Sequence, residues 1–218
     1  MTDAPLAVAV LISGTGSNLK AVIDAQDSGL LNIDIRLVIS NKADAPGLNH
    51  ARKAGISFIV IQPGNREAQD IEIRQHLYDC GAELVILAGY MRIIGEELVD
   101  AFEGKIINLH PALLPLYPGL DTYQRVLDAG DAEHGSSIHF VTAELDAGPV
   151  ISQVRIPVLD TDDAASVATR LGPNEHRLLL ATVELFAARR VIMAAGGVQL
   201  DGIPLDHPLL LNANDTFD

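Results

Sequence analysis

The sequence predicts an α/β fold built on a doubly wound, mostly parallel sheet with a mixed C-terminal part. Through the first half of the chain, apolar runs of strand length alternate with segments of helical periodicity, the pattern of parallel βαβ units. The run at 84–87 is apolar throughout, as expected for a central strand covered on both faces. After Pro111 the pattern changes to prolines, helices and two further strands. We therefore expect a Rossmann-like sheet that becomes mixed in its second half.

Each element of the first half follows from its local pattern. The leading apolar run is a strand, glycines and small polar residues follow it, and a helix begins at Ser17. Helical spacing of Ile71, Ile73 and Leu77 predicts the last helix of this half. The expected strands lie at 6–12, 33–39, 58–61 and 84–87, and the expected helices at 17–26, 47–54 and 66–78.

A proline-rich loop ending at Gly119 opens the second half. Gly172 and Pro173 predict a break between two helices, because proline removes a hydrogen bond from a helix interior. A short hairpin-like tail closes the chain. Without a repeat or a long linker, residues 1–218 are expected to form one domain, with halves at 1–110 and 111–218. The expected elements of the second half are helices at 122–128, 163–171 and 175–188 and strands at 136–141 and 150–157.

Composition narrows the class of partner. The formal net charge of −14 argues against nucleic acid, whose recognition depends on clustered Lys and Arg. With no apolar run of about 18 residues and no basic leader, we expect neither a membrane span nor secretion. The single cysteine, Cys80, excludes an internal disulfide and suits a reducing cytoplasm. A phosphorylated small molecule remains compatible, because helix N-termini bind anions through local amides.

Asn108, His110 and Asp146 are the strongest candidates for catalysis. An apolar run leads into Asn108, and His110 is followed by prolines, so both lie at the carboxyl end of a strand, where α/β sheets bind ligands. Asp146 stands between an apolar strand and a Gly-Pro turn, and beside His110 it would favour the imidazolium form. The alternatives are strand capping for Asn108 and His110 and a local turn for Asp146. His139 could belong to the same site, but a strand histidine satisfied by its neighbours is the favoured interpretation, and no histidine spacing indicates a metal site.

The turn between the first strand and the first helix predicts a phosphate site. Glycines allow close backbone approach, and the amides of Gly16, Ser17 and Asn18 would lie at a helix N-terminus. The spacing lacks the third glycine of the dinucleotide fingerprint and the Gly-Lys-Ser/Thr of a triphosphate loop. The alternative is a purely structural turn.

A second loop, residues 89–94, follows the strand at 84–87 and could line the pocket of an aromatic ligand. It is apolar apart from Arg92. Arg66 begins a helix, where a cation is unfavourable unless it has a partner, and an acidic ligand could be that partner. A loop that only closes the core and a solvated Arg66 are the alternatives.

Taken in order, these motifs closely resemble the folate-dependent phosphoribosylglycinamide formyltransferases, from Val8 to at least Glu175. This chain departs from the family pattern at Ala112, at Leu116, in the stretch 172–174 and at Leu179-Leu180. The matching segments are 12–19, 40–45, 87–93, 108–111 with 113–115, and 134–137 through 146–149.

The resemblance implies transfer of a formyl group from 10-formyltetrahydrofolate to the amine of glycinamide ribonucleotide in purine biosynthesis, without a metal. Residues 1–110 would bind the phosphate, and residues 111–218 would complete the folate and catalytic sites. Asn108 and protonated His110 would stabilise the oxyanion, and Asp146 would keep His110 charged and relay a proton through water. The implied ribonucleotide ligands are Gly16, Ser17, Asn18 and Glu175, and the implied folate ligands are Arg66, Met91, Arg92, Ile93, Ile94, Asn108, Thr142, Ala143, Glu144, Leu145 and Asp146.

Three rival functions stay open at this point. A formyltetrahydrofolate hydrolase should carry an extra amino-terminal domain. A methionyl-tRNA formyltransferase should carry an extra carboxyl-terminal domain and a basic surface, which the charge of −14 does not favour. A non-catalytic folate- or nucleotide-binding module would not need Asn108, His110 and Asp146 together. A monomer and a homodimer are both compatible with the sequence.

Overall fold

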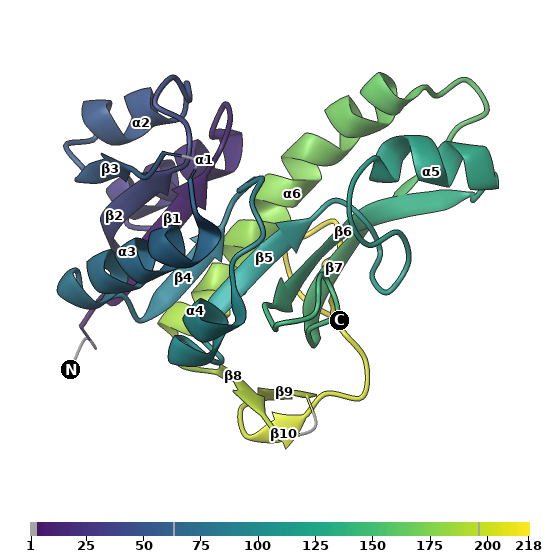
Figure 1. The fold of residues 1–218 in the computed structure, drawn as a ribbon. Helices are drawn as coiled ribbons and strands as arrows, with labels where there is room; N and C mark the ends of the chain where they lie inside the picture. The colour runs from purple at the N-terminus through teal and green to yellow at the C-terminus, as the bar shows by residue number, and fades with distance from the viewer. Residues whose placement is uncertain (1–3, 63, 196) are drawn as a thin grey trace.

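The computed structural model describes residues 4–62, 64–195 and 197–218, and its core is an eight-stranded sheet (Figure 1). The strands of this sheet are β1 (Leu6–Ile12), β2 (Ile33–Ser40), β3 (Phe58–Val60), β4 (Leu84–Leu87), β5 (Ile106–His110), β6 (Glu133–Phe140), β7 (Val150–Pro157) and β11 (Leu209–Leu210). The helices are α1 (Ser17–Asp27), α2 (Leu48–Lys53), α3 (Arg66–Asp79), α4 (Glu96–Ala101), α5 (Thr122–Ala129) and α6 (Ala164–Ala187). A separate three-stranded sheet contains β8 (Val191–Ala194), β9 (Gly197–Leu200) and β10 (Ile203–Pro204).

The order of strands in the large sheet is β11-β7-β6-β5-β4-β1-β2-β3. Strands β1 to β5 pair in parallel, whereas β6 is antiparallel to β5 and β7 is antiparallel to β6. The predicted mostly parallel sheet with a mixed C-terminal part is therefore confirmed. Because the chain runs outward from β1 to β3 and returns to β4 on the other side, the order reverses between β1 and β4. Ligands of open α/β sheets bind at this kind of reversal, outside the carboxyl ends of the strands.

Helices cover both faces of the parallel part of the sheet (Figure 1). Every residue of β1 is buried, and successive side chains point to opposite faces. Val8 and Val10 pack in one core with α1, α2 and α6, while Ala9 and Leu11 pack in the other with α3 and α4. This double burial explains why the first half reads as uniformly apolar runs.

The predicted break at Gly172 and Pro173 is wrong, because α6 continues through both residues. Apolar side chains of α6 are buried before and after the proline, among them Leu171 and Leu178. An interior proline costs about 3 kcal/mol, and burial of several leucines at about 1.5–3 kcal/mol each outweighs that cost. The side chain of Asn174 also donates to the Arg170 carbonyl at 3.0 Å, next to the gap that the proline leaves in the backbone ladder.

Two elements of the structure lie outside the sequence prediction. Helix α4 has only six residues. Its N-cap is Gly95, so no capping side chain indicates in the sequence where the helix begins. Strand β11 comes from the predicted hairpin-like tail but adds in parallel to β7 at the edge of the large sheet. Among the described residues, no helix is both long and apolar enough to span a membrane.

Candidate active site

A cavity of about 900 Å³ opens at the carboxyl ends of β4 and β5. Four segments line it: the loop after β4, the end of β5 with Pro111, the segment 119–123 before and within α5, and the stretch from His139 past β6 to Asp146. Cavities of roughly 300–1,000 Å³ are typical of small-molecule sites. The predicted folate residues on the two outer loops, 91–94 and 142–146, all belong to this lining.

Strand β5 supplies Asn108 and His110. Residues two apart on a strand face the same side, so both side chains point into the cavity. His110 is 5% exposed, and its Nε2 lies 2.9 Å from the Tyr117 carbonyl. Because a carbonyl only accepts, Nε2 carries the proton in this contact and Nδ1 is the nitrogen free to gain or lose one.

Asp146 reaches this strand from the loop after β6. Its Oδ2 accepts a 2.8 Å hydrogen bond from the Gly119 amide, far along the chain. Its backbone φ of 51° lies in the left-handed region, which aspartate tolerates better than most residues. Asp146 does lie in a turn, as the alternative interpretation held, but its carboxylate bonds to Gly119 on another loop.

The amide, the imidazole and the carboxylate meet in the cavity, as the sequence predicted. His110 Nδ1 lies 3.5 Å from Asp146 Oδ2, and Asn108 Nδ2 lies 3.5 Å from Asp146 Oδ1. The side chains of the His110–Asp146 pair are 6% and 7% exposed. Electrostatic interactions are stronger here than at a water-exposed surface, because burial lowers the local dielectric.

His139 belongs to the same cluster, although the sequence favoured a purely structural role for it. In the β5–β6 register it stands opposite Asn108, and its Nε2 lies 3.2 Å from Asn108 Nδ2 and 3.6 Å from Asp146 Oδ1. Its Nδ1 donates to the Phe140 carbonyl at 2.9 Å, so Nε2 is the side that faces the cluster. Only the antiparallel register places His139 here, and that register has no short-range signal in the sequence.

Electrostatics corrects one part of the sequence hypothesis, that Asp146 keeps His110 charged. Burial lowers the pKa of His110 below its usual 6.5, and the Tyr117 carbonyl and Asp146 oppose this only in part. Burial therefore favours the neutral form of His110 in the unliganded protein. Burial would by itself raise the pKa of Asp146, but the His139 and Gly119 contacts and the nearby imidazoles bring it below the usual range.

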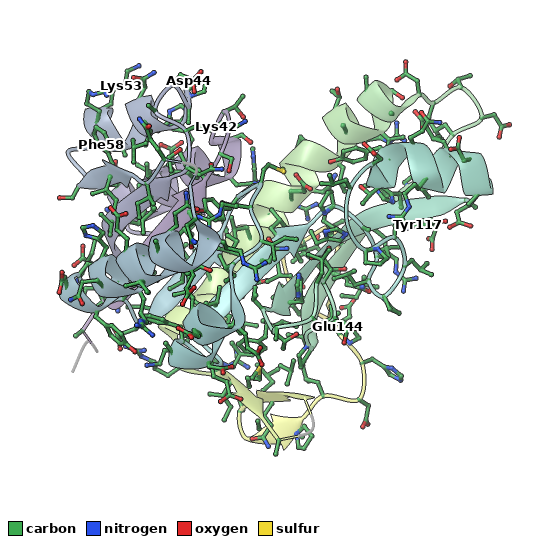
Figure 2. All side chains as sticks on the ribbon, in the orientation of Figure 1. Lys42, Asp44, Lys53, Phe58, Tyr117 and Glu144 are labelled. Atoms are coloured by element: carbon green, nitrogen blue, oxygen red, sulfur yellow. The ribbon has the colours of Figure 1, made fainter. Side chains whose placement is uncertain are left out.

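The proline-rich loop that carries Tyr117 and Gly119 is fixed from beneath by two buried side chains. Ser137 Oγ donates to the Ala112 carbonyl at 2.7 Å and accepts from the Leu114 amide at 3.0 Å. Gln153 Nε2 donates to the Leu114 carbonyl and to Ser137 Oγ, both at 2.9 Å. Figure 2 labels Tyr117 on this loop and Glu144 on the loop after β6, on the same side of the molecule.

The predicted phosphate loop connects β1 to α1. Gly16 is the N-cap of α1 with φ 71° and has no side-chain cap, so the amides at the helix start remain available to an anion. A Cβ at Gly16 would lie 2.7 Å from the Gly47 Cα, so the two backbones are in contact. Ser17 is exposed, and Asn18 Oδ1 is buried without a hydrogen-bond partner among the described residues.

Arg66 and Glu175, like Gly16, Ser17 and Asn18 of the phosphate loop, do not belong to the cavity lining. Arg66, at the start of α3, borders a separate groove of about 260 Å³ between α3 and α4. Glu175, on α6, accepts a 2.8 Å hydrogen bond from Ser136 Oγ, and burial raises its pKa. Glu175 also raises the pKa of Tyr123, a lining residue, after the larger effect of burial. In the described part of the chain, no group of three or more His, Cys, Asp or Glu side chains is arranged so that it could hold a metal ion.

Comparison with known proteins agrees with the fold. A family model described as formyl transferase matches residues 6–183. A phosphoribosylglycinamide formyltransferase of Escherichia coli (strain K12) is 43% identical over 198 residues, which cover 89% of this chain and 93% of that relative. The chain belongs to the phosphoribosylglycinamide formyltransferases. The predicted family and the predicted enzyme class are thus confirmed.

A solved structure and a further sequence relative support the same conclusion, and a more distant solved structure shares the fold alone. The phosphoribosylglycinamide formyltransferase of Coxiella burnetii superposes with a TM-score of 0.88 at 42% identity, covering 92% of this chain and 96% of that one. A trifunctional purine biosynthetic protein of Homo sapiens is 39% identical over 193 residues, or 87% of this chain but 19% of that protein. A formyltetrahydrofolate deformylase of Pseudomonas syringae shares the fold with a TM-score of 0.86 at 24% identity.

Proposed function

We propose that this chain transfers the formyl group of 10-formyltetrahydrofolate to the amine of glycinamide ribonucleotide, a step of purine biosynthesis, by direct attack of the amine. The observation that carries the mechanism is the contact network of Asn108, His110, His139 and Asp146 inside one cavity. The cavity is also lined by the loop 89–94, which is apolar apart from Arg92 and suits a flat heteroaromatic donor. No covalent enzyme intermediate is required.

In the first step the amine nitrogen attacks the formyl carbon, and the carbonyl oxygen becomes an oxyanion. Asn108 Nδ2 is the amide donor of the cluster and would donate to that oxygen. A preorganised donor of this kind contributes roughly two to three powers of ten in rate. When the carbon–nitrogen bond to the folate breaks, the oxyanion returns to a carbonyl.

His110 would become charged only as the reaction proceeds, by taking at Nδ1 the proton that the attacking amine releases and then giving it up to the departing folate nitrogen through water. Burial keeps its pKa low in the free protein, whereas an oxyanion beside the ring would raise it. The imidazolium is then stabilised by the oxyanion and by Asp146 Oδ2, 3.5 Å from Nδ1. Because this stabilisation grows between the bound substrates and the transition state, it accelerates the reaction without tightening substrate binding to the same extent.

Asp146 would complete the proton transfer. The attacking amine must lose a proton, and the departing folate nitrogen must gain one. A carboxylate with a lowered pKa beside two imidazoles can orient a water molecule between these positions and hold His110 in its charged form. The Gly119 amide fixes the carboxylate for this purpose at 2.8 Å.

We assign the two substrates to different parts of the molecule. The amides of Gly16, Ser17 and Asn18 would bind the ribonucleotide phosphate, with Glu175 near the glycyl amine. Residues 91–94, Asn108 and residues 142–146 would surround the folate, and Arg66 would meet its acidic tail from the neighbouring groove. We further infer a cytoplasmic enzyme that acts on these two small molecules as a monomer or a homodimer.

A formyl-transfer assay tests the proposal directly. Purified protein is incubated with 10-formyltetrahydrofolate, with and without glycinamide ribonucleotide, and both tetrahydrofolate and formate are quantified. We expect tetrahydrofolate to form only when the ribonucleotide is present and formate to stay at background. Formate release that is independent of the ribonucleotide would indicate a hydrolase instead. Tight folate binding without turnover of either kind would indicate a binding module.

A further inference from the structure

The loop between β4 and α4 has no helix or strand of its own, although residues 89–94 line the cavity. Other parts of the molecule must therefore fix its conformation. At its start, the Ser13 amide donates to the Gly89 carbonyl at 3.2 Å, and Ser13 Oγ accepts from the Met91 amide at 2.8 Å. The end of the loop needs a second anchor.

Asp70 of α3 is that anchor. Its side chain is buried and does not line the cavity. Oδ1 accepts from Arg92 Nη2 at 3.2 Å, and Oδ2 accepts from the Gly95 amide at 2.7 Å. Arg92 Nη2 also donates to the Arg66 carbonyl at 3.3 Å, which ties the same guanidinium to the start of α3.

The contact with Asp70 explains why residue 95 is a glycine, which has no Cβ. Its φ of −84° is open to any residue, so backbone conformation does not require glycine. A Cβ there would lie 2.7 Å from Asp70 Oδ2, too close for the carboxylate to stay in place. The carboxylate thereby accepts from the amide of Gly95, the N-cap of α4, and its negative charge lies at the positive end of that helix.

The Asp70–Arg92 pair is too buried to be an ordinary surface ion pair. The two side chains are 7% and 15% exposed. A buried ion pair adds little net stability compared with apolar residues of the same size, but its geometry is strict and the loss of one partner leaves an unpaired charge. A pair of this kind therefore serves chiefly to fix the positions of its two residues.

We propose that Asp70 is a positioning residue for the folate co-substrate, because it holds the end of the cavity-lining loop through Arg92 and Gly95. The inference rests on the proposed function, in which this loop contacts the folate. Asp70 lies outside the cavity lining and borders the groove beside Arg66. Its removal should therefore displace one binding surface and leave the cluster of Asn108, His110 and Asp146 intact.

The first test is Asp70→Asn, which keeps the shape of the side chain and removes its charge. We expect the KM for 10-formyltetrahydrofolate and the Kd for tetrahydrofolate to rise about tenfold, or about 1.4 kcal/mol. At saturating folate, kcat and the Kd for glycinamide ribonucleotide should stay within about twofold of the wild type. Glu72→Gln is the matched control, because it removes a charge from an exposed position of the same helix.

Gly95→Ala serves as a second variant, since the unpaired Arg92 of Asp70→Asn could prevent folding. The alanine Cβ pushes on Asp70 Oδ2 without deleting a charge. It should reproduce the selective loss of folate affinity. In an Arg92→Met background, Asp70→Asn should add less than about twofold to the folate KM, because the interaction is already gone.

These results separate this inference from the proposed function. A wild-type protein that binds no tetrahydrofolate contradicts the proposed function itself. A wild type that binds it, with folded variants that either retain full folate affinity or lose affinity for both ligands alike, contradicts the role of Asp70 alone. If the fold-increases in folate KM caused by Asp70→Asn and by Arg92→Met multiply in the double variant, the two residues do not act through one shared anchor.

Discussion

The phosphate loop and the catalytic cluster solve the same problem, the placement of polar groups, in opposite ways. The phosphate loop uses consecutive residues, and the binding groups proposed for it are the backbone amides at the turn from β1 into α1. The cluster uses side chains from β5, from β6 and from the loop after β6, which meet at distances of 3.2 to 3.6 Å. One site is local in the sequence, and the other exists only in the folded sheet.

This difference predicts different sensitivities to substitution. A side-chain cluster loses chemistry when one functional group is removed, while the backbone around it stays in place. A backbone site has no functional group to remove and is damaged only by a change in the path of the chain. Variants of the two regions should therefore separate turnover from ribonucleotide binding.

The largest effect is expected in the catalytic cluster. His110→Ala and Asp146→Asn should each lower kcat by at least about a hundredfold, because each acts on the transition state. The Kd for tetrahydrofolate should stay within roughly tenfold of the wild type, since residues 91–94 and 142–145 of the cavity lining are unchanged. Steady-state kinetics and calorimetric titration of the folded variants provide the two measurements. Near-normal turnover in either variant would contradict the catalytic assignment.

The next effect is expected in the phosphate loop. Gly16→Val combines a φ of 71°, which a β-branched residue resists, with a Cβ only 2.7 Å from Gly47 Cα. Ribonucleotide affinity should fall by at least about tenfold, while folate affinity barely changes. Calorimetric titrations of one folded variant with each ligand test this expectation. Equal losses for both ligands would indicate general misfolding, and no loss for the ribonucleotide would place its phosphate elsewhere.

Gly47→Ala is a milder companion to that variant. Gly47 has a φ of −59°, so alanine introduces no backbone strain there. Its Cβ would still lie 3.0 Å from Gly16 Cα and 2.7 Å from Ile12 Cδ1. A smaller loss with the same selectivity would show that the path of the loop, and not the residue type at position 16, determines ribonucleotide binding.

The same contrast explains which parts of the molecule could be predicted from the sequence. Strands β1 and β4 were predicted with their observed bounds, because burial on both faces leaves an unbroken apolar run between turn residues. The predicted break in α6 failed because local proline chemistry was weighed without the buried face on both sides of it. Helix α4 had no local signal, since its N-cap contact comes from Asp70 on another helix.

Within the site, residue types could be predicted but their contacts could not. Asn108, His110 and Asp146 interrupt apolar segments, and that local contrast identified them. His139 interrupts a similar segment but gains its role from pairing with Asn108 across two strands. The charge state of His110 depends on how deeply the folded chain buries it, which sequence spacing does not report.

A smaller effect is expected where the two regions touch. Ser13 follows β1 and begins the phosphate loop. It also holds the cavity loop, because its amide donates to the Gly89 carbonyl and its hydroxyl accepts from the Met91 amide. Its hydroxyl also donates to Asn41 Oδ1 at 2.6 Å. Ser13→Ala removes these side-chain bonds and should raise the Kd of both substrates by about fivefold, the usual worth of a neutral hydrogen bond. Titrations that show loss for one ligand only would mean that the loops are positioned independently.

The smallest effect concerns acid stability, which should depend on the second half of the chain. His134 on β6 is 1% exposed, and neither ring nitrogen has a hydrogen bond of good geometry among the described residues. Burial lowers the pKa of His134 below its usual 6.5, with a weaker opposing effect of the Pro111 carbonyl. Burial also lowers the pKa of His110 and His176, while Glu175 has a raised pKa and acts in the opposite direction.

The sign follows from proton counting. Below pH 6.5 the unfolded chain binds a proton at His134 that the folded chain refuses, so the free energy of unfolding falls as the pH falls toward the lowered pKa. His134→Leu removes this titration and leaves no buried polar group behind. Urea unfolding at pH 7.5, 6.5 and 5.5 should therefore show a shallower pH dependence for the variant, by at most about 1.4 kcal/mol per pH unit for one group. A variant with the same slope as the wild type would mean that His134 keeps its proton affinity on folding, and acid sensitivity would then have to come from His110 and His176.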